Sequence, residues 1–343
     1  MKRLLNTLYV TAQDRYLSLD GENVVVRNQD EEIGRVPLHN LEAIITFGYP
    51  GTSPALMGAC VKRGIDLCFL SGSGRFLARV SGEIKGNVTL RKEQYRVSEN
   101  EEKSLMISRD FIAGKVYNAR WVLERAARDY PMRLDADKMK TKSAFLKANI
   151  SKIRTCGSAE ELLGLEGESA SIYFSVFDDL ILQQKEEFCF HGRSRRPPLD
   201  FTNAMLSFAY TLLAGMCSAA LETVGLDPYV GFFHKDRPGR ASLALDLMEE
   251  LRAVMADRFV LTLINKRIIG PEGFIKKEDG AVIMDEDTRK QFLSSWQTKK
   301  AESITHPFLD EKIEWGMVPY VQALLLARFL RGDLDEYPPF LWK

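Results

Sequence analysis

The chain has 343 residues, of which 45 % are hydrophobic and 27 % charged. This is the composition of a globular protein with room for one large or two medium domains, and it excludes disordered and collagen-like chains. Lysine plus arginine number 47 and aspartate plus glutamate also number 47, so the formal net charge is zero. A uniformly basic nucleic-acid binder is therefore excluded, whereas local basic patches are not.

Neither a membrane span nor an export signal is expected. The longest apolar stretch, residues 204–220, is interrupted by Ser207 and Thr211 and falls short of the roughly 20 apolar residues of a spanning helix. Two charges near the N-terminus are not followed by an apolar signal core, which indicates a cytoplasmic protein. The five cysteines form no CxxC pair, so we expect buried thiols and neither a disulfide framework nor a structural zinc site.

The first part of the chain is expected to be β-structure. Short segments rich in β-forming residues predict strands at residues 4–10, 16–19, 23–26, 33–36, 43–46, 66–70 and 76–80. Asp20-Gly21 is a hairpin signal between the second and third of them. One helix is expected at residues 54–63, ending at Gly64. We therefore predict an N-terminal β-rich, β-sandwich-like domain over residues 1–85.

Beyond about residue 87 the hydrophobic period changes from two to 3.6, which is typical of helices. Helices are expected at residues 90–129, 136–154, 159–184, 203–223, 242–258, 287–300 and 312–331. The exception is residues 273–284, where two short apolar runs flank Asp279-Gly280 and predict a β-hairpin. The predicted fold class is thus α+β, with a larger all-α domain over residues 86–343 following the β-domain.

A glutamate between two glycines is the first candidate for chemistry. Glu166 lies between Gly164 and Gly167 inside an otherwise helical pattern. Two glycines in a helix interior cost roughly 2 kcal/mol relative to alanine. One interpretation is the close approach of another backbone or a ligand, and the other is a break between two helices that leaves Glu166 in solvent.

The second candidate is a turn-rich loop, residues 231–240, together with the helix that follows it. The loop contains His234, and the helix carries Asp246, Glu249 and Glu250 at spacings that place them on one face. These carboxylates are either a solvated face or a group whose repulsion a cation offsets. An imidazole with two or three carboxylates suits Mn(II) or Mg(II) better than zinc, and such a metal polarises phosphoryl oxygens.

Several motifs carry a resemblance to a known family. They are Leu163-Gly164-Leu165-Glu166-Gly167, then Arg195-Arg196-Pro197-Pro198, then Gly231-Phe232-Phe233-His234 and Asp246-Leu247-Met248-Glu249. In this order, over nearly the whole chain, the sequence resembles the CRISPR-associated adaptation integrase and endonuclease family, the universal first Cas protein ("Cas one"). It looks closest to the type I-C branch of that family.

The resemblance implies a site and an assembly. The β-domain would form a homodimer, and the α-helical domain would be catalytic. Glu166, His234 and Glu249 would be the catalytic residues and, together with Asp246, would hold Mg(II) or Mn(II). Glu168 is a rival for the role of Glu166, although the Gly-x-Glu-Gly context favours Glu166.

The resemblance also implies a reaction. Relatives insert captured foreign duplexes into a CRISPR array by attack of a DNA 3′-hydroxyl on repeat phosphodiesters. The implied partners are double-stranded DNA (prespacer and CRISPR repeat) and the small companion protein "Cas two", in a heterohexameric complex. Two alternatives stay open: a metal-dependent nuclease of branched DNA that does not integrate it, and a non-catalytic DNA-binding scaffold.

Because the net charge is zero, DNA binding requires local positive charge. The candidates are basic residues in three clusters: Lys140, Lys142 and Lys147; Arg193, Arg195 and Arg196; and Lys235, Arg237 and Arg240. Each cluster alone could be a solvated face. The last two clusters flank the expected metal ligands in sequence, so we interpret them as phosphate clamps.

Overall fold

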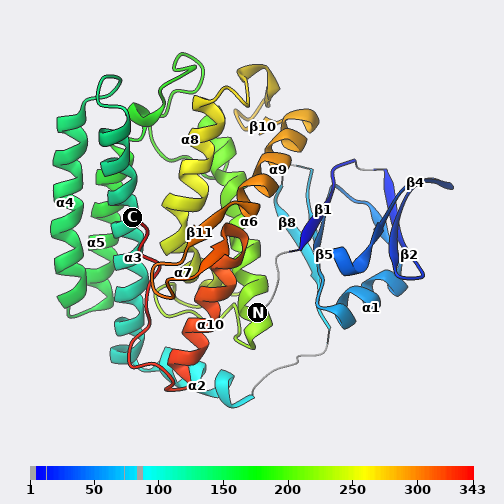
Figure 1. Ribbon diagram of the computed structural model, residues 1–343, viewed down its shortest axis with the longest axis horizontal. Helices are drawn as coiled ribbons and strands as arrows, with labels where there is room; N and C mark the ends of the chain where they lie inside the picture. Colours follow the sequence, from blue (N-terminus) through cyan, green and yellow to red (C-terminus); the bar gives the residue numbers. More distant parts are fainter. Residues whose placement is uncertain (1–4, 13, 73, 83–87) are drawn as a thin grey trace.

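The computed structural model describes residues 5–12, 14–72, 74–82 and 88–343, and it consists of a β-rich part beside a larger helical part (Figure 1). The last strand of the β-rich part ends at Val80 and the first helix of the helical part begins at Val88. The predicted α+β class and the order of the two parts are therefore confirmed. The expected domain boundary at residue 85, and the first four residues, lie outside the described residues.

The β-rich part contains two four-stranded sheets. The first has the order β1-β5-β7-β8 and the second β4-β3-β2-β6. The first sheet consists of β1 (Asn6–Val10), β5 (Leu41–Phe47), β7 (Asp66–Leu70) and β8 (Phe76–Val80), and the second of β2 (Arg15–Asp20), β3 (Asn23–Asn28), β4 (Glu31–Pro37) and β6 (Gly51–Thr52). β1, β5 and β7 are parallel, and β8 is antiparallel to β7. Every strand expected from the sequence forms, and the two-residue β6 is an addition.

A shared core joins the two sheets to α1 (Pro54–Arg63). Leu17 and Val24 from one sheet and Ile44 from the other are fully buried in it. α1 begins where the Ser53 hydroxyl accepts a hydrogen bond from a backbone N–H of the first turn. The helix ends, as predicted, at Gly64, whose φ of 67° is the left-handed conformation that glycine adopts without strain.

The helical part is built mainly from nine further helices among the described residues. They are α2 (Val88–Glu99), α3 (Glu101–Asp129), α4 (Ala136–Thr155), α5 (Ala159–Phe174), α6 (Phe201–Val224), α7 (Ser242–Leu251), α8 (Arg258–Asn265), α9 (Glu286–Ala301) and α10 (Val318–Leu330). The single helix expected over residues 90–129 is two, because the Asn100 side chain accepts the Lys103 N–H and caps a new helix. The helix expected over residues 242–258 continues into a π-helical turn, Arg252–Asp257, between α7 and α8.

α6 is the central helix of this part (Figure 1). Both α7 and α10 pack against it. By length and composition alone it is the one helix of the described residues that could cross a membrane, yet 67 % of its most apolar window is buried inside the protein. α6 therefore packs as a core helix, and Phe208, Leu213 and Leu221 are among its buried side chains.

The helical part is not all-α, which corrects one expectation. β9 (Phe274–Lys276) and β10 (Val282–Met284) form the predicted hairpin. A second hairpin pairs β11 (Ser303–Thr305) with β12 (Lys312–Glu314), and β12 occupies residues assigned from the sequence to the start of the last helix. Only the middle residue of β12, Ile313, is buried, so this segment alternates with the period of a strand.

Residues 337–342 cross α3 and α7 as a segment that we call the C-terminal strap. The Tyr337 hydroxyl donates to Glu250 Oε1 at 2.6 Å, and the Phe340 N–H donates to Glu250 Oε2 at 2.7 Å. Asn118 of α3 donates to the Phe340 carbonyl at 2.7 Å and accepts from the Trp342 N–H at 2.9 Å. The strap thereby holds Glu250 of α7 in a fully paired, buried position.

Glu250 makes the stability of the protein depend on pH. Burial raises the pKa of Glu250 to about 7, despite opposing hydrogen bonds from Tyr337, Phe340 and Gln322. Between the ordinary pKa and this raised one, the folded state holds a proton that the unfolded chain has lost, so stability falls as pH rises through that window. We expect the difference in melting temperature between Glu250→Gln and the wild type to shift in favour of the variant as the pH rises from about 5 to about 8. A difference that is independent of pH in calorimetric melts would contradict this assignment.

Candidate active site

Three helices meet at the side chain of Lys115. Its Nζ, from α3, is paired with Glu166 Oε1 on α5 and lies 2.6 Å from Glu249 Oε2 on α7. The side chains of Lys115 and Glu166 are 15 % and 19 % exposed and that of Glu249 only 4 %. Two of the predicted site residues therefore come together around a lysine that the sequence analysis did not select.

A glycine lets α3 approach α7 closely beside this lysine. A Cβ on Gly114 would lie 3.1 Å from the Cβ atoms of both Glu250 and Pro339. These distances are tighter than ordinary van der Waals contact, so a larger residue would force α3 away from α7 and from the strap. Gly114 thus sets the separation at which Lys115 reaches Glu249.

The Glu166 segment is one uninterrupted helix. α5 runs through both Gly164 and Gly167, so the interpretation of a break between two helices is wrong. Apart from the backbone of α5 itself and the adjacent residues, no described atom lies within 4 Å of a Cβ built on either glycine, so no other segment packs closely there and the surface beside Glu166 is open. Glu168 is exposed and accepts a hydrogen bond from Asn149, so among the two rivals Glu166 is the one that faces Lys115.

Asp246 holds the His234 imidazole in place. Its Oδ1 lies 2.7 Å from His234 Nδ1, and its two oxygens also accept the backbone N–H groups of Phe232, Phe233 and His234. This pairing places the proton on Nδ1 and leaves the Nε2 lone pair available for a metal. Within the described residues Nε2 makes no hydrogen bond. Because both oxygens of Asp246 already accept these donors, the geometry favours an orienting role for Asp246 over the expected role as a metal ligand.

Arg252 is a second charged residue that the sequence analysis missed. It lies in the π-helical turn, donates to Glu249 Oε1 at 2.7 Å, and stacks on the Tyr210 ring with 4.4 Å to the centroid. Burial alone would raise the pKa of Glu249, but the charges of Arg252, Lys115 and His234 outweigh it and lower this pKa to about 2. Glu249 is thus an ionised carboxylate at neutral pH. The effect of His234 on the pKa of Glu249 also shows that the imidazole lies near this carboxylate.

The donor set fits a hard divalent cation. Among the described residues no three histidine, cysteine, aspartate or glutamate side chains are already arranged to enclose a metal ion, because the Lys115 ammonium lies between the two carboxylates. Glu249 Oε2 is buried and is paired with the Lys115 ammonium at 2.6 Å, so its negative charge already attracts a cation at this position. Two carboxylates and an oriented imidazole are the ligands that Mg(II) and Mn(II) accept.

Two of the predicted phosphate clamps are half-buried and make contacts within the protein. Arg193 donates to Asn203 Oδ1 at 2.5 Å and lies over the ring of Tyr210. Arg240 donates to the Lys235 carbonyl and, at 3.3 Å, to Ser242 Oγ. Both guanidinium groups therefore hold loop backbone and neighbouring side chains.

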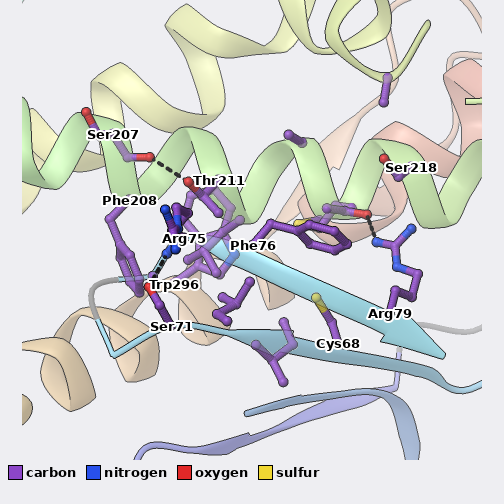
Figure 2. A pocket seen from close by; sticks show the side chains of 18 of the residues that line it. Cys68, Ser71, Arg75, Phe76, Arg79, Ser207, Phe208, Thr211, Ser218 and Trp296 are labelled. Carbon is purple, nitrogen blue, oxygen red and sulfur yellow. Dashed lines mark hydrogen bonds between the residues drawn. The ribbon is translucent and has the colours of Figure 1, made fainter. Parts of the chain in front are cut away.

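The other predicted clamps stay accessible. Lys235, Arg237, Lys140 and Lys147 are exposed and Lys142 is half-buried. Arg195 and Arg196 are exposed and line a cavity of about 1040 Å³ between the β-rich part and α6. Figure 2 shows Phe76 and Arg79, from β8, beside α6 in this cavity, with Arg79 near Ser218 and Phe208 at the other end of the view. Glu166, His234 and Glu249 are absent from its lining, so these two arginines are not part of the Lys115 cluster.

The sequence of this chain is similar to sequences of a known protein family. The family model described as "CRISPR associated protein Cas1" matches residues 8–298. The chain belongs to the Cas1 family. It is 47 % identical over 343 residues to the CRISPR-associated endonuclease Cas1 1 of Chlorobaculum tepidum, covering 100 % of each chain.

Two solved structures share the Cas1 fold. A casposase bound to an integration product matches with a TM-score of 0.85 at 22 % identity, covering 99 % of this chain and 95 % of that one. A Cas6-RT-Cas1–Cas2 complex matches with a TM-score of 0.81 at 20 % identity, covering 99 % of this chain and 36 % of the longer one. The order of a β-rich part and a helical part is therefore the arrangement of the Cas1 family.

The orienting role of Asp246 predicts a specific effect of Asp246→Asn. Loss of the carboxylate that fixes the imidazole should weaken Mn(II) binding about 10- to 100-fold. The measurement is Mn(II) affinity by calorimetry, with ring-nitrogen NMR to follow the tautomer of His234. Asp236→Asn is the matched control, because Asp236 is an exposed residue of the loop that carries His234. Equal Mn(II) affinity in both variants would remove Asp246 from the site.

Proposed function

We propose that this chain is a CRISPR adaptation integrase, a metal-dependent endonuclease and strand transferase that inserts captured DNA into a CRISPR array. The observation that carries the proposal is the convergence of Glu166 and Glu249 on one cation, with the oriented imidazole of His234 beside them. The three residues come from separate segments of the chain. Membership of the Cas1 family, whose relative from Chlorobaculum tepidum is named an endonuclease, supports the nuclease chemistry.

Each residue of the cluster has a role in this reaction. Glu166, Glu249 and His234 Nε2 would hold Mg(II) or Mn(II), which when bound polarises a phosphoryl oxygen and stabilises developing charge. Asp246 keeps the His234 lone pair directed outward, and Arg252 keeps Glu249 ionised. The nucleophile is the 3′-hydroxyl of the incoming DNA, so the protein needs no covalent intermediate.

The proposal extends to partners. We place this chain in the type I-C branch, in the cytoplasm, as a homodimer formed through the β-rich part, where edge strands such as β4 need covering. Its further partners would be double-stranded DNA and Cas2, in a heterohexameric integration complex. The solved relatives whose titles include an integration product and a Cas1–Cas2 complex support the DNA and Cas2 partners.

The charged surface divides into two groups with different expected roles. Lys140, Lys142 and Lys147 belong to α4, which packs against α3 and α5 and therefore lies beside the helices of the cluster. Arg237 is exposed, three residues after His234. The lysines would contact the DNA backbone, and Arg237 would lie near the reacting phosphate.

The first test of the proposal is the loss of strand transfer. His234→Ala, Glu166→Gln and Glu249→Gln should each lower the rate by at least about a thousandfold, because the metal contributes several kcal/mol of transition-state stabilisation. Glu168→Gln is the matched control on α5 and should keep wild-type activity. The assay counts insertions into a plasmid that carries a repeat array. Cleavage without insertion would favour the nuclease alternative, and wild-type insertion by His234→Ala would refute the site.

The second test separates binding from chemistry. Neutralising Lys140, Lys142 and Lys147 together should shrink the slope of log affinity against log salt by about 0.9 for each lost phosphate contact. The single-turnover rate on bound DNA should not change. Arg237→Ala should instead slow that rate at saturating DNA, since a charge beside the scissile phosphate acts in the transition state. An unchanged slope in the lysine variant would remove α4 from the DNA path.

A further inference from the structure

The proposed function does not explain why the positively charged side chain of Lys115 lies between the two carboxylates. Its Nζ is paired with both Glu166 and Glu249, the two carboxylates assigned to the metal. Its side chain is 15 % exposed, and within the part of the chain that the structure describes it is the one residue with an ion pair to both carboxylates. A lysine in that position occupies the place that the metal would need.

We propose that Lys115 is a positioning cation that couples metal binding to DNA binding. Its ion pairs hold Glu166 and Glu249 together, and it gives up this place to the metal when a DNA phosphate accepts its ammonium group. This inference rests on the proposed function, because it presumes that the two carboxylates bind the metal.

Geometry and charge both disfavour joint occupancy. The ammonium lies 2.6 Å from Glu249 Oε2 and is also paired with Glu166, so it occupies the space between the two carboxylates. A metal ion in that space would be repelled by the ammonium across a site that is largely withdrawn from water. Movement of Lys115 away from the carboxylates would therefore favour metal binding.

The surroundings allow this movement. The backbone of α3 is fixed by the contact of Gly114 with Glu250 and Pro339, whereas the lysine side chain has four rotatable bonds. The surface of α5 beside Glu166 is open at both of its glycines. A DNA phosphate that reaches this surface would present an acceptor for the ammonium group within the same neighbourhood, so one step frees the carboxylates and adds a phosphate contact.

The first experiment measures Mn(II) affinity in the absence of DNA. Lys115→Met should bind Mn(II) about tenfold or more tightly than the wild type, because a competing positive charge has been removed. Lys115→Arg keeps the charge and should stay close to the wild type. Lys103→Met, which removes an exposed lysine of the same helix, is the matched control. Lys115→Gln replaces the methionine variant if circular dichroism shows that it does not fold.

The outcomes separate this inference from the proposed function. If Glu249→Gln leaves Mn(II) affinity unchanged, the metal site itself is wrong and both proposals fail. If Glu249→Gln loses Mn(II) while Lys115→Met matches the wild type, the metal site stands and the coupling role of Lys115 is refuted. Equal tightening in Lys115→Arg and Lys115→Met would show an effect of shape rather than charge, which also overturns the inference.

The second experiment measures the salt dependence of binding to a fixed DNA duplex. With saturating Mn(II), Lys115→Met should show a slope smaller by about 0.9 than the wild type, the value for one lost phosphate contact. Without metal the two slopes should agree, because Lys115 is then held by its carboxylates. A slope difference of the same size in both conditions, or in neither, would contradict the transfer of Lys115 to DNA.

Discussion

The structure depends on how one buried negative charge is compensated. Glu249 is almost completely withdrawn from water, and an isolated carboxylate in that position would be strongly destabilised. Lys115 and Arg252 compensate it from two directions, one from α3 and one from the π-helical turn. Since Lys115 also pairs with Glu166, the same charge balance fixes α3, α5 and α7 relative to each other. The geometry of the site is therefore inseparable from the packing of these helices.

Neighbouring residues of α7 show how strongly the surroundings decide protonation. Glu249 and Glu250 are both buried, yet the pKa of the first is lowered to about 2 and that of the second is raised to about 7. Cations surround Glu249, whereas Glu250 meets neutral donors from Gln322, Tyr337 and the Phe340 backbone. One face of α7 thus presents a permanently charged group to the site. The other presents a carboxyl group whose burial favours its neutral form and which ties the helix to the strap.

Local sequence patterns predicted the elements well wherever the determining interactions are local. Alternation of apolar residues placed the strands of both sheets, and Gly64 placed the end of α1, because these signals lie within a few residues of the element that they define. The spacing of Asp246 and Glu249 likewise brought them to one side of α7. Lys115 could not be found in this way, since its partners lie on other helices. Its signal was a lysine next to a glycine on an otherwise buried helix face.

Clusters of basic residues in the sequence were the least reliable predictor of which side chains are available to contact DNA. Arg193 and Arg240 belong to basic clusters in the sequence, but their guanidinium groups donate to carbonyls of their own loops and, for Arg193, to Asn203 of α6. Five donors on a planar group make arginine suitable for this internal role as much as for phosphate. The π-helical turn also could not be predicted from local sequence patterns, because its extra residue per turn is stabilised by the tertiary contacts of Arg252 and Asp257.

The strap also has a consequence for the time order of folding. Glu250 and Asn118 receive their partners from residues 337–342, which the ribosome adds long after α3 and α7 have been made. Until then the growing chain holds a carboxyl group and an amide without their native partners at the junction of those helices. Contacts of such long sequence separation form late. The pairing of Glu250 and Asn118 is therefore completed only after residues 337–342 have been added, so a nascent chain stalled before them lacks the contact that closes the junction of α3 and α7.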